Sequence, residues 1–331
     1  LWQLFFVTPE ALTGVNTATR AGETTKDALE KMPVGGIIYF AKNLEDTDQT
    51  SEMLKNTQSY VKIPLFLGVD EEGGRVARVS SNEDMGVDPI DAMGTFGESG
   101  DIASLYNAVS GLAAGIHALG LNFDFAPVAD VSSGKNSVIG DRSFGTDASL
   151  CASMVSVAAS ALTDSGVVPC LKHFPGYGSA SADDHNGLAE VTKTLEELEQ
   201  CDLVPFISGI EKGAPFIMVS HLSVPALTGG DMPCDLSYEA VTETLRNKMG
   251  FTGVIITDAQ NMASITSRYD AGEAAVQALK AGVDMILMPD DLQAAYDAVS
   301  SAVGSGSLSA QRIDESVLRI LQVKAKYGLL P

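Results

Sequence analysis

Residues 253–258 read Gly-Val-Ile-Ile-Thr-Asp, a short apolar run that ends in a carboxylate. A continuous run of this length, rich in β-branched residues, is typical of a strand buried on both faces of a parallel sheet. Similar runs recur along the chain. The predicted strands are Leu4–Val7, Gly36–Phe40, Pro64–Asp70, Asn122–Asp130, Val167–Phe174, Pro215–His221, Gly253–Asp258 and Asp284–Pro289.

Amphipathic stretches lie between most of these strands and are predicted to be helices. Examples are Lys26–Met32, Ile102–Leu119, Ala148–Thr163, Leu195–Ile210 and Tyr238–Met249. Thr194 followed by Glu197 matches a capping box, and Ser309 and Gly328 bound a last helix. Strand–helix alternation eight times over favours an α/β fold, a single (β/α)8 TIM barrel, over an open sheet. No linker divides the chain, so we expect one domain over residues 1–331.

The composition argues against several classes of function. The formal net charge of −22 opposes binding to nucleic acid and to anionic lipid. The expected substrate is therefore neutral, or it reaches its pocket through locally basic residues. No apolar run approaches the ~20 residues of a membrane span. The cysteines are scattered, without a C-x-x-C pair, and are predicted to be free core thiols rather than metal ligands; they are Cys151, Cys170, Cys201 and Cys234. We expect neither a metal nor another cofactor.

The oligomeric state and the compartment are less constrained by the sequence. A monomer is expected. The chain opens at Leu1 in an apolar segment, with no visible signal peptide. It is expected to be cytoplasmic, or secreted or attached to the cell envelope if a signal sequence preceded Leu1.

Charged and polar residues end several of the predicted strands. Asp70 ends the third strand, Lys172 and His173 lie at the end of the fifth, His221 ends the sixth and Asp258 ends the seventh. In a barrel these ends share one face, where active sites are built. Because buried strands rarely end in charge without a reason, the sequence predicts a functional site on that face.

The loop after the fifth strand carries a candidate proton-transfer pair. It reads Lys-His-Phe-Pro-Gly-Tyr-Gly over residues 172–178 and continues to Asp183-Asp184-His185. A carboxylate two residues from an imidazole can fix its tautomer and leave the other nitrogen for proton transfer. The alternative is an Asx-type turn beside a solvated histidine.

Two further segments allow a functional and a structural interpretation. Asp258 is either a nucleophile or base, or the cap of the next helix. Residues 68–78 combine three carboxylates and two arginines around a glycine pair. They either hold a polyhydroxylated ligand or form an internally paired loop.

The motifs taken together resemble glycoside hydrolase family 3, in its single-domain β-N-acetylglucosaminidase (β-N-acetylhexosaminidase) branch. The matching motifs are GVDEEGGRVARV at 68–79, IGDRSFG at 139–145, KHFPGYG at 172–178 with DDH at 183–185, GVIITDAQNM at 253–262 and RIDESVLRILQVKAKYGLL at 312–330. They span nearly the whole chain. The combination is far more specific than any one motif.

The resemblance implies a role for each matching residue. Asp258 matches the catalytic nucleophile, and His185 matches the general acid/base, paired with Asp183. The residues that match binding of the terminal sugar are Asp70, Arg78, Arg142, Lys172 and His173, to which we add His221 as a further candidate. Two positions depart from related enzymes: Tyr177 stands where histidine is frequent, and Asp184 where serine is common.

The expected activity is retaining hydrolysis that releases a terminal non-reducing β-linked N-acetylglucosamine. Candidate substrates are peptidoglycan (muropeptide) fragments, chitin oligomers and glycoprotein sugars. Four alternatives stay open. The first is a β-glucosidase of the same family, which would take its acid/base carboxylate from a second domain. In this chain the Asp183–His185 pair is expected to take the place of that carboxylate. The others are a phosphate-dependent phosphorylase, a metal-dependent barrel hydrolase and a non-catalytic sugar-binding protein.

Overall fold

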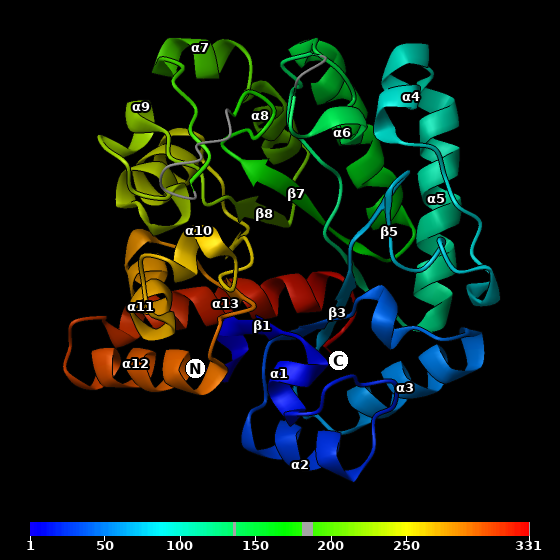
Figure 1. Ribbon diagram of the computed structural model, residues 1–331, viewed down its shortest axis with the longest axis vertical. Coiled ribbons are helices and arrows are strands. Elements are labelled where there is room, and N and C mark those ends of the chain that lie inside the picture. Colours follow the sequence, from blue (N-terminus) through cyan, green and yellow to red (C-terminus); the bar gives the residue numbers. More distant parts are fainter. Residues whose placement is uncertain (135–136, 181–187, 331) are drawn as a thin grey trace.

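The computed structural model describes residues 1–134, 137–180 and 188–330. Within these residues, eight strands pair in parallel in the order β10-β1-β2-β3-β6-β7-β8-β9. Figure 1 shows β1, β3, β7 and β8 in the middle of the molecule. A parallel bridge between Ile256 and Met285 joins the two ends of this order and nearly closes the barrel. The strands are β1 (Phe5–Val7), β2 (Gly36–Ile38), β3 (Phe66–Val69), β6 (Phe123–Asp124), β7 (Val168–Phe174), β8 (Phe216–Val219), β9 (Val254–Thr257) and β10 (Ile286–Leu287). The predicted (β/α)8 barrel is confirmed, and each strand lies inside its predicted range.

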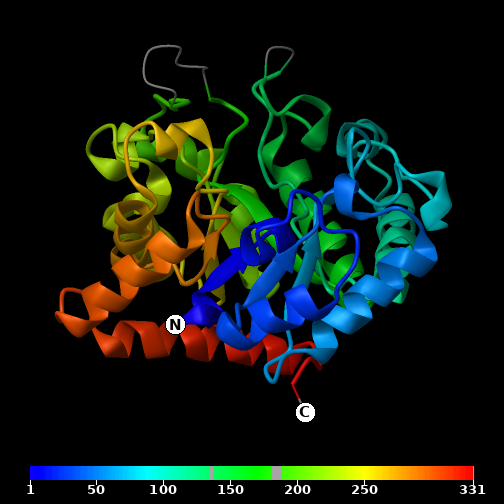
Figure 2. The same ribbon diagram turned by 60° about the horizontal axis from the view of Figure 1, so that its bottom comes forward.

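Helices surround these strands (Figure 2). They are α1 (Pro9–Thr13), α2 (Glu23–Lys31), α3 (Thr47–Ser59), α4 (Met93–Ser99), α5 (Ile102–Leu119), α6 (Ala148–Asp164), α7 (Leu195–Gln200), α8 (Val204–Glu211), α9 (Pro225–Thr228), the π-helix η6 (Glu239–Lys248), α10 (Ala263–Thr266), α11 (Ala271–Ala281), α12 (Leu292–Gly304) and α13 (Ala310–Lys326). A small hairpin of β4 (Glu71–Gly73) and β5 (Val76–Ala77) follows β3.

One predicted helix is wrong as a single element. The range 195–210 contains two helices, α7 and α8, separated by residues 201–203. Pro205 lies in the first turn of α8, where its missing N–H costs nothing, but it would break a continuous helix. The predicted capping box is confirmed, since the Thr194 hydroxyl accepts from the Glu197 backbone N–H and Glu197 accepts from the Thr194 backbone N–H.

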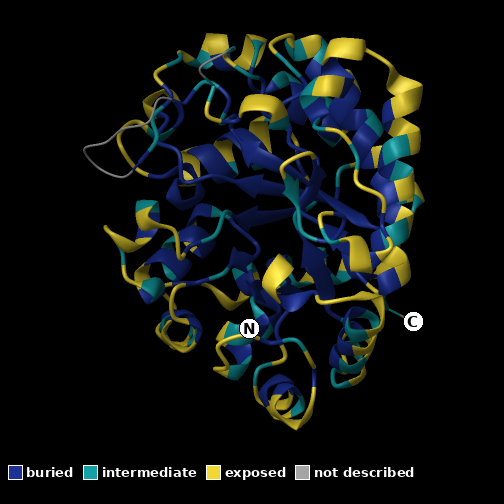
Figure 3. Cartoon of the chain, turned by 45° about the vertical axis from the view of Figure 1, so that its right-hand side comes forward, coloured by how far each residue is buried: buried dark blue, intermediate teal, exposed yellow. Residues whose placement is uncertain are grey.

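Aromatic side chains fill the interior of the barrel. The ring centroid of Phe123 lies 5.2 Å from that of Phe6, 4.7 Å from Phe125 and 4.8 Å from Phe216. A Cβ atom at Gly36 would come within 2.6 Å of the Phe6 ring, so glycine there makes room for the aromatic layer. The barrel is therefore a packed core rather than a pore, as Figure 3 shows by the buried colour of its strands.

Helix α5 is the one described helix that is long and apolar enough to cross a membrane by length and composition alone. In the fold it packs against α3 and α6. Its face with Leu105, Leu112 and Ile116 is buried. The core helix of a barrel passes the same test of length and composition.

Helix α13 runs beneath the N-terminal ends of the strands (Figure 2). From it, the fully buried Lys324 points to Gln3, and its Nζ donates a hydrogen bond of 2.8 Å to Gln3 Oε1. The carboxyl ends of the strands lie at the other end of the barrel, where the loops form an open cavity.

Candidate active site

A cavity of about 360 Å³ lies at the carboxyl ends of the strands. Its size is at the small end of ligand pockets, which span roughly 300–1,000 Å³. The predicted site residues that line it are Asp70, Arg78, Arg142, Lys172, His173 and Asp258. The fold therefore brings together side chains that are up to 188 residues apart in the sequence, from Asp70 to Asp258.

Lys172 lies at the centre of a charged network beside the cavity. Its Nζ is 2.7 Å from Asp70 Oδ1 and 2.6 Å from Glu72 Oε1. Arg142 donates two hydrogen bonds to Glu72, of 2.7 Å from Nε and 2.8 Å from Nη2. This bidentate geometry fixes the plane of the guanidinium group.

The network keeps its members charged. Burial alone would raise the pKa of Glu72, but the charges of Lys172 and Arg142 outweigh it and lower that pKa to about 2. Burial likewise opposes charge on Lys172, yet Asp70 and Glu72 raise the pKa of the ammonium above its ordinary value. The cavity therefore offers fixed charges that can hydrogen-bond the hydroxyl groups of a sugar.

Glu71 has a structural role in the hairpin that carries Glu72. Its Oε2 accepts hydrogen bonds from the backbone N–H of Arg78 and of Val79, each 2.7 Å long. The Ser80 hydroxyl donates to its other oxygen. Of the two interpretations of residues 68–78, internal pairing therefore holds for Glu71, whereas Asp70, Glu72 and Arg78 face the cavity.

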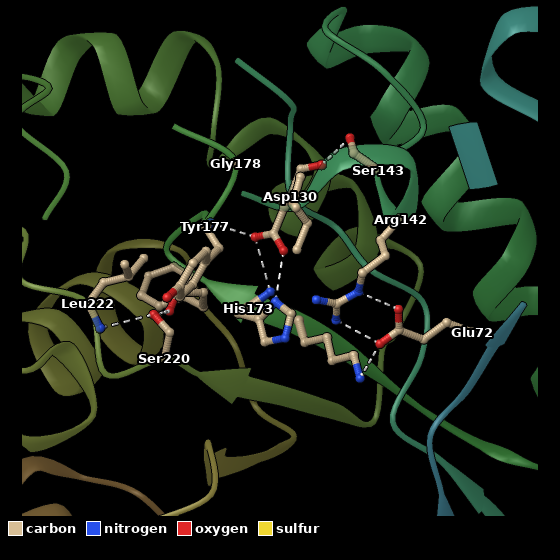
Figure 4. Close-up of polar contacts among 12 residues, drawn as sticks. Glu72, Asp130, Arg142, Ser143, His173, Tyr177, Gly178, Ser220 and Leu222 are labelled. Carbon is tan, nitrogen blue, oxygen red and sulfur yellow. Dashed lines mark hydrogen bonds and ion pairs between the residues drawn. The ribbon is translucent and has the colours of Figure 1, made fainter. Parts of the chain in front are cut away.

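His173 is oriented by a carboxylate that the sequence did not single out. Its Nδ1 lies 2.8 Å from Asp130 Oδ2, and the backbone N–H groups of His173 and Tyr177 donate to Asp130 Oδ1 (Figure 4). Asp130 is 1% exposed. With Nδ1 engaged by the carboxylate, Nε2 is the nitrogen left for a ligand. The available signal was a carboxylate at the end of the predicted strand 122–130.

Asp258 follows β9 and is ionised at neutral pH. Ala259 donates its backbone N–H to Asp258 Oδ1 at 2.8 Å. Burial would raise the pKa of Asp258, but the charges of His173 and His221 lead the opposing effects and hold it below its ordinary value. An ionised, desolvated carboxylate beside a polar cavity is suited to nucleophilic attack.

His221 does not line the cavity. The side chain is buried, its Nε2 is 2.9 Å from the Ala259 carbonyl oxygen and its Nδ1 is 3.1 Å from Asp235 Oδ1. Both ring nitrogens are therefore directed at protein groups. Its predicted contact with the sugar stays a prediction, which this geometry does not favour.

The predicted acid/base pair, Asp183 and His185, and the neighbouring Asp184 lie outside the described residues. Two fully buried carboxylates near the site, Asp124 and Asp235, were not predicted at all. Burial raises the pKa of Asp124 well above its ordinary value. Among the described residues there is no group of three or more histidine, cysteine or acidic side chains that could hold a metal ion.

Comparison with known proteins places this site in a family. Residues 4–323 match the family model described as "Glycosyl hydrolase family 3 N terminal domain". The chain is 31% identical to "Beta-hexosaminidase A" of Pseudoalteromonas piscicida, over 93% of this chain and 56% of that protein. It is 36% identical to "Beta-hexosaminidase LpqI" of Mycobacterium tuberculosis, over 88% of this chain and 76% of that protein.

A solved structure shares the fold over almost the full chain. It is described as a glycoside hydrolase family 3 β-N-acetylglucosaminidase from Paenibacillus sp. str. FPU-7. The TM-score is 0.91 at 34% identity, and the match covers 99% of this chain and 62% of the other. This chain thus spans between about half and three quarters of the length of these three relatives.

Proposed function

Since this chain belongs to glycosyl hydrolase family 3, we propose that it acts as a retaining β-N-acetylhexosaminidase that releases a terminal β-linked N-acetylglucosamine. One observation carries the proposal. The ionised Asp258 lines a cavity of about 360 Å³, together with Asp70, Arg78, Arg142 and Lys172. The names of the relatives support this class of substrate.

In the proposed first step, Asp258 attacks the anomeric carbon. A bond forms between its carboxylate oxygen and that carbon while the glycosidic bond breaks, and the departing oxygen takes a proton from His185. The product is a glycosyl ester of Asp258. The cationic groups of Lys172 and Arg142 hold the sugar hydroxyls and keep the nucleophile in a positively charged setting.

In the proposed second step, water replaces the enzyme at the same carbon. His185 accepts a proton from water as the hydroxyl oxygen bonds to the anomeric carbon, and Asp258 departs as a carboxylate. Two displacements restore the original β configuration. A histidine whose ordinary pKa is about 6.5 serves in both directions near neutral pH. Asp183 would fix its tautomer.

A comparison of aryl substrates tests the proposal. The purified chain should hydrolyse a nitrophenyl β-N-acetylglucosaminide well above the matching β-glucoside, because a pocket built to pair an acetamido group leaves polar atoms unpaired without it. Comparable kcat/KM values for the two sugars would favour a β-glucosidase. Release of a sugar 1-phosphate when phosphate is added would favour a phosphorylase. Failure to turn over either sugar would contradict the proposal.

A further inference from the structure

A second histidine–carboxylate pair lies behind the proposed nucleophile. His221 follows β8 and is 5% exposed, and Asp235 is fully buried in the short helix η5 (Cys234–Leu236). Their facing atoms, Nδ1 and Oδ1, are 3.1 Å apart. The His221 ring is the ion-pair partner of this carboxylate, whose oxygens accept no hydrogen bond from the described residues. An unpaired buried carboxylate would be costly, so the pair favours a protonated ring.

The backbone holds the two residues against each other. Cys234 donates its N–H to the Leu222 carbonyl at 2.9 Å, and Asp235 donates its N–H to the Ser220 carbonyl at 3.3 Å. Residues 234–235 therefore run alongside residues 220–222. This pairing places Asp235 beside His221 through main-chain bonds, independently of the charge on either side chain.

The other side of the His221 ring faces the backbone that follows the nucleophile. Its Nε2 donates to the Ala259 carbonyl oxygen at 2.9 Å. Ala259 in turn donates its N–H to Asp258 Oδ1 at 2.8 Å. Nε2 thus donates a hydrogen bond, while Nδ1 lies within ion-pair distance of Asp235 Oδ1 without the alignment of a hydrogen bond. A ring that carries a proton on both nitrogens gives the buried Asp235 a counter-charge.

We propose that His221, held by Asp235, is a positioning residue for the hydrolysis reaction: its imidazolium fixes Ala259 and places a permanent positive charge behind Asp258. The inference rests on the proposed function. A carboxylate nucleophile must be ionised to attack, and Asp258 is a partly buried carboxylate in the wall of the cavity. A fixed cation on the protein side keeps it ionised without occupying the sugar cavity.

The surroundings of these groups act in both directions. Burial raises the pKa of Asp235, and the charge of His221 opposes that rise. The titratable groups that interact electrostatically with Asp258 come from β7, the loop after it and the segments after β8; they are Cys170, Lys172, His173, Tyr177, His221 and Asp235. Burial lowers the pKa of His221, but Asp235, followed by Asp258, outweighs it and raises that pKa to about 9. The charge of Lys172, from the side of the cavity, also lowers the pKa of Asp258.

The first test needs no activity. In the wild-type protein, the side-chain nitrogen NMR signals of His221 should show a doubly protonated ring at pH 7, titrating near pH 9. A His221→Gln variant identifies the signals by their loss. A neutral His221 ring at pH 7 would overturn the inference whether or not the chain hydrolyses sugars.

The second test uses the pH profile of kcat/KM for a nitrophenyl β-N-acetylglucosaminide. The double variant His221→Gln/Asp235→Asn removes both charges and keeps groups able to hydrogen-bond. Its acidic limb should move up by about one pH unit or more, because a cation next to the nucleophile is lost. If the acidic limb of the variant lies one pH unit higher, kcat/KM of the variant is roughly tenfold lower than that of the wild type at any pH on the acidic limbs of both proteins.

Asp231→Asn is the matched control, since it removes a carboxylate from the same loop where it is largely exposed and paired to Arg268. Its acidic limb should coincide with that of the wild type.

If the folded double variant also keeps the wild-type limb, His221 is only a structural residue and the inference fails. If the double variant does not fold, Asp235→Asn alone must lower the His221 pKa in the NMR titration; an unchanged titration contradicts the proposal. Wild-type protein inactive on every glycoside would instead contradict the proposed function.

Discussion

Both ends of the barrel contain buried charged side chains, but the groups that surround these charges differ between the two ends. At the carboxyl end, Lys172 lies between two carboxylates beside an open cavity. At the amino end, Lys324 is fully buried, donates to the neutral Gln3 and lies 5.0 Å from the centroid of the Phe66 ring. Burial lowers the pKa of Lys324 to about 7, whereas the pKa of Lys172 is raised.

Carboxylates differ between the two ends in the same way. Asp284, at the amino end, is fully buried and contacts three guanidinium groups, with distances of 2.6 Å to Arg246, 3.3 Å to Arg312 and 3.0 Å to Arg319. Two of these arginines also donate to backbone carbonyls, Arg246 to Gly253 and Arg312 to Val283, each at 2.7 Å. Asp284 thus links α13 and η6 to the strands through ion pairs, whereas Asp258 lines a cavity.

The comparison shows that burial of charge does not by itself identify an active site. At the amino end the charges contact backbone and helices, so they stabilise the closure of the barrel. At the carboxyl end they surround a space of about 360 Å³. The position at the carboxyl ends of the strands, together with open volume, distinguishes the site. The same distinction predicts which substitutions impair catalysis and which impair stability.

The largest effect is expected for Asp258→Ala. Loss of the nucleophile removes the two-step path, so kcat on a nitrophenyl β-N-acetylglucosaminide should fall by several orders of magnitude. The melting temperature should change little or rise, since a desolvated charge is removed. A folded Asp258→Ala protein that retains substantial activity would refute the assignment of the nucleophile.

His185→Ala should have a large effect that depends on the leaving group. On a disaccharide, whose sugar alcohol leaves only when protonated, kcat/KM should fall by roughly 10²–10⁴-fold. On the nitrophenyl sugar, the first step should be much less affected, and a burst followed by slow turnover should appear. Azide, which needs no base, should then restore turnover. Asp183→Ala should give a milder form of the same pattern.

Equal losses on both substrates, without a burst, would remove His185 from the acid/base role. Asp184 would then be the next candidate from the same loop. Glu71 and Glu72 are weaker candidates, because Glu71 is bonded to backbone N–H groups and Glu72 to Lys172 and Arg142.

At the amino end, Asp284→Asn should impair stability rather than chemistry. Removing one charge from a buried network leaves guanidinium groups without a counter-charge, which costs about 3–5 kcal/mol of unfolding free energy. Urea denaturation measures this loss. The KM of the folded fraction should remain at the wild-type value. A raised KM with unchanged stability would contradict the assignment of the amino end to stability and the carboxyl end to catalysis.

The smallest effect is expected for Lys324→Met. A lysine whose pKa is lowered in the folded state is charged there only below about pH 7, while the unfolded chain holds the proton up to its ordinary pKa. The unfolded state therefore binds more protons between these values, and wild-type stability gains from this group as pH rises through them. Lys324→Met removes the penalty, so its melting temperature should exceed that of the wild type by a few degrees at pH 6 and by less at pH 9. If the difference in melting temperature between Lys324→Met and the wild type grew as the pH rose, the predicted direction of the effect would be wrong.

The strands and most helices follow from the sequence because each signal is local. The apolar runs 167–174 and 253–258 reveal buried strands by their composition alone, and the capping box at Thr194 marks a helix start within four residues. The interruption of helix 195–210 was missed because the amphipathic pattern continues through it. Pro205 was the signal that could have revealed the break.

The site was predictable where a residue ends a strand and not where it acts through another residue. Asp70, Lys172 and Asp258 lie at strand ends, so the barrel alone places them together. Asp130 and Asp235 bind the imidazoles of His173 and His221 across 43 and 14 residues of sequence, and such partnerships arise only from the tertiary fold. The sequence could name the histidines but not the carboxylates that orient them.

Peptide mass mapping of the glycosyl-enzyme tests the central claim most directly. The His185→Ala variant is mixed with a nitrophenyl β-N-acetylglucosaminide, quenched in acid during the burst and digested. The proposed mechanism predicts a mass increase of one N-acetylglucosaminyl group on the peptide that contains Asp258, absent from the Asp258→Ala/His185→Ala double variant. A label on another residue, or no label together with an α-configured first product from the wild type, would contradict it.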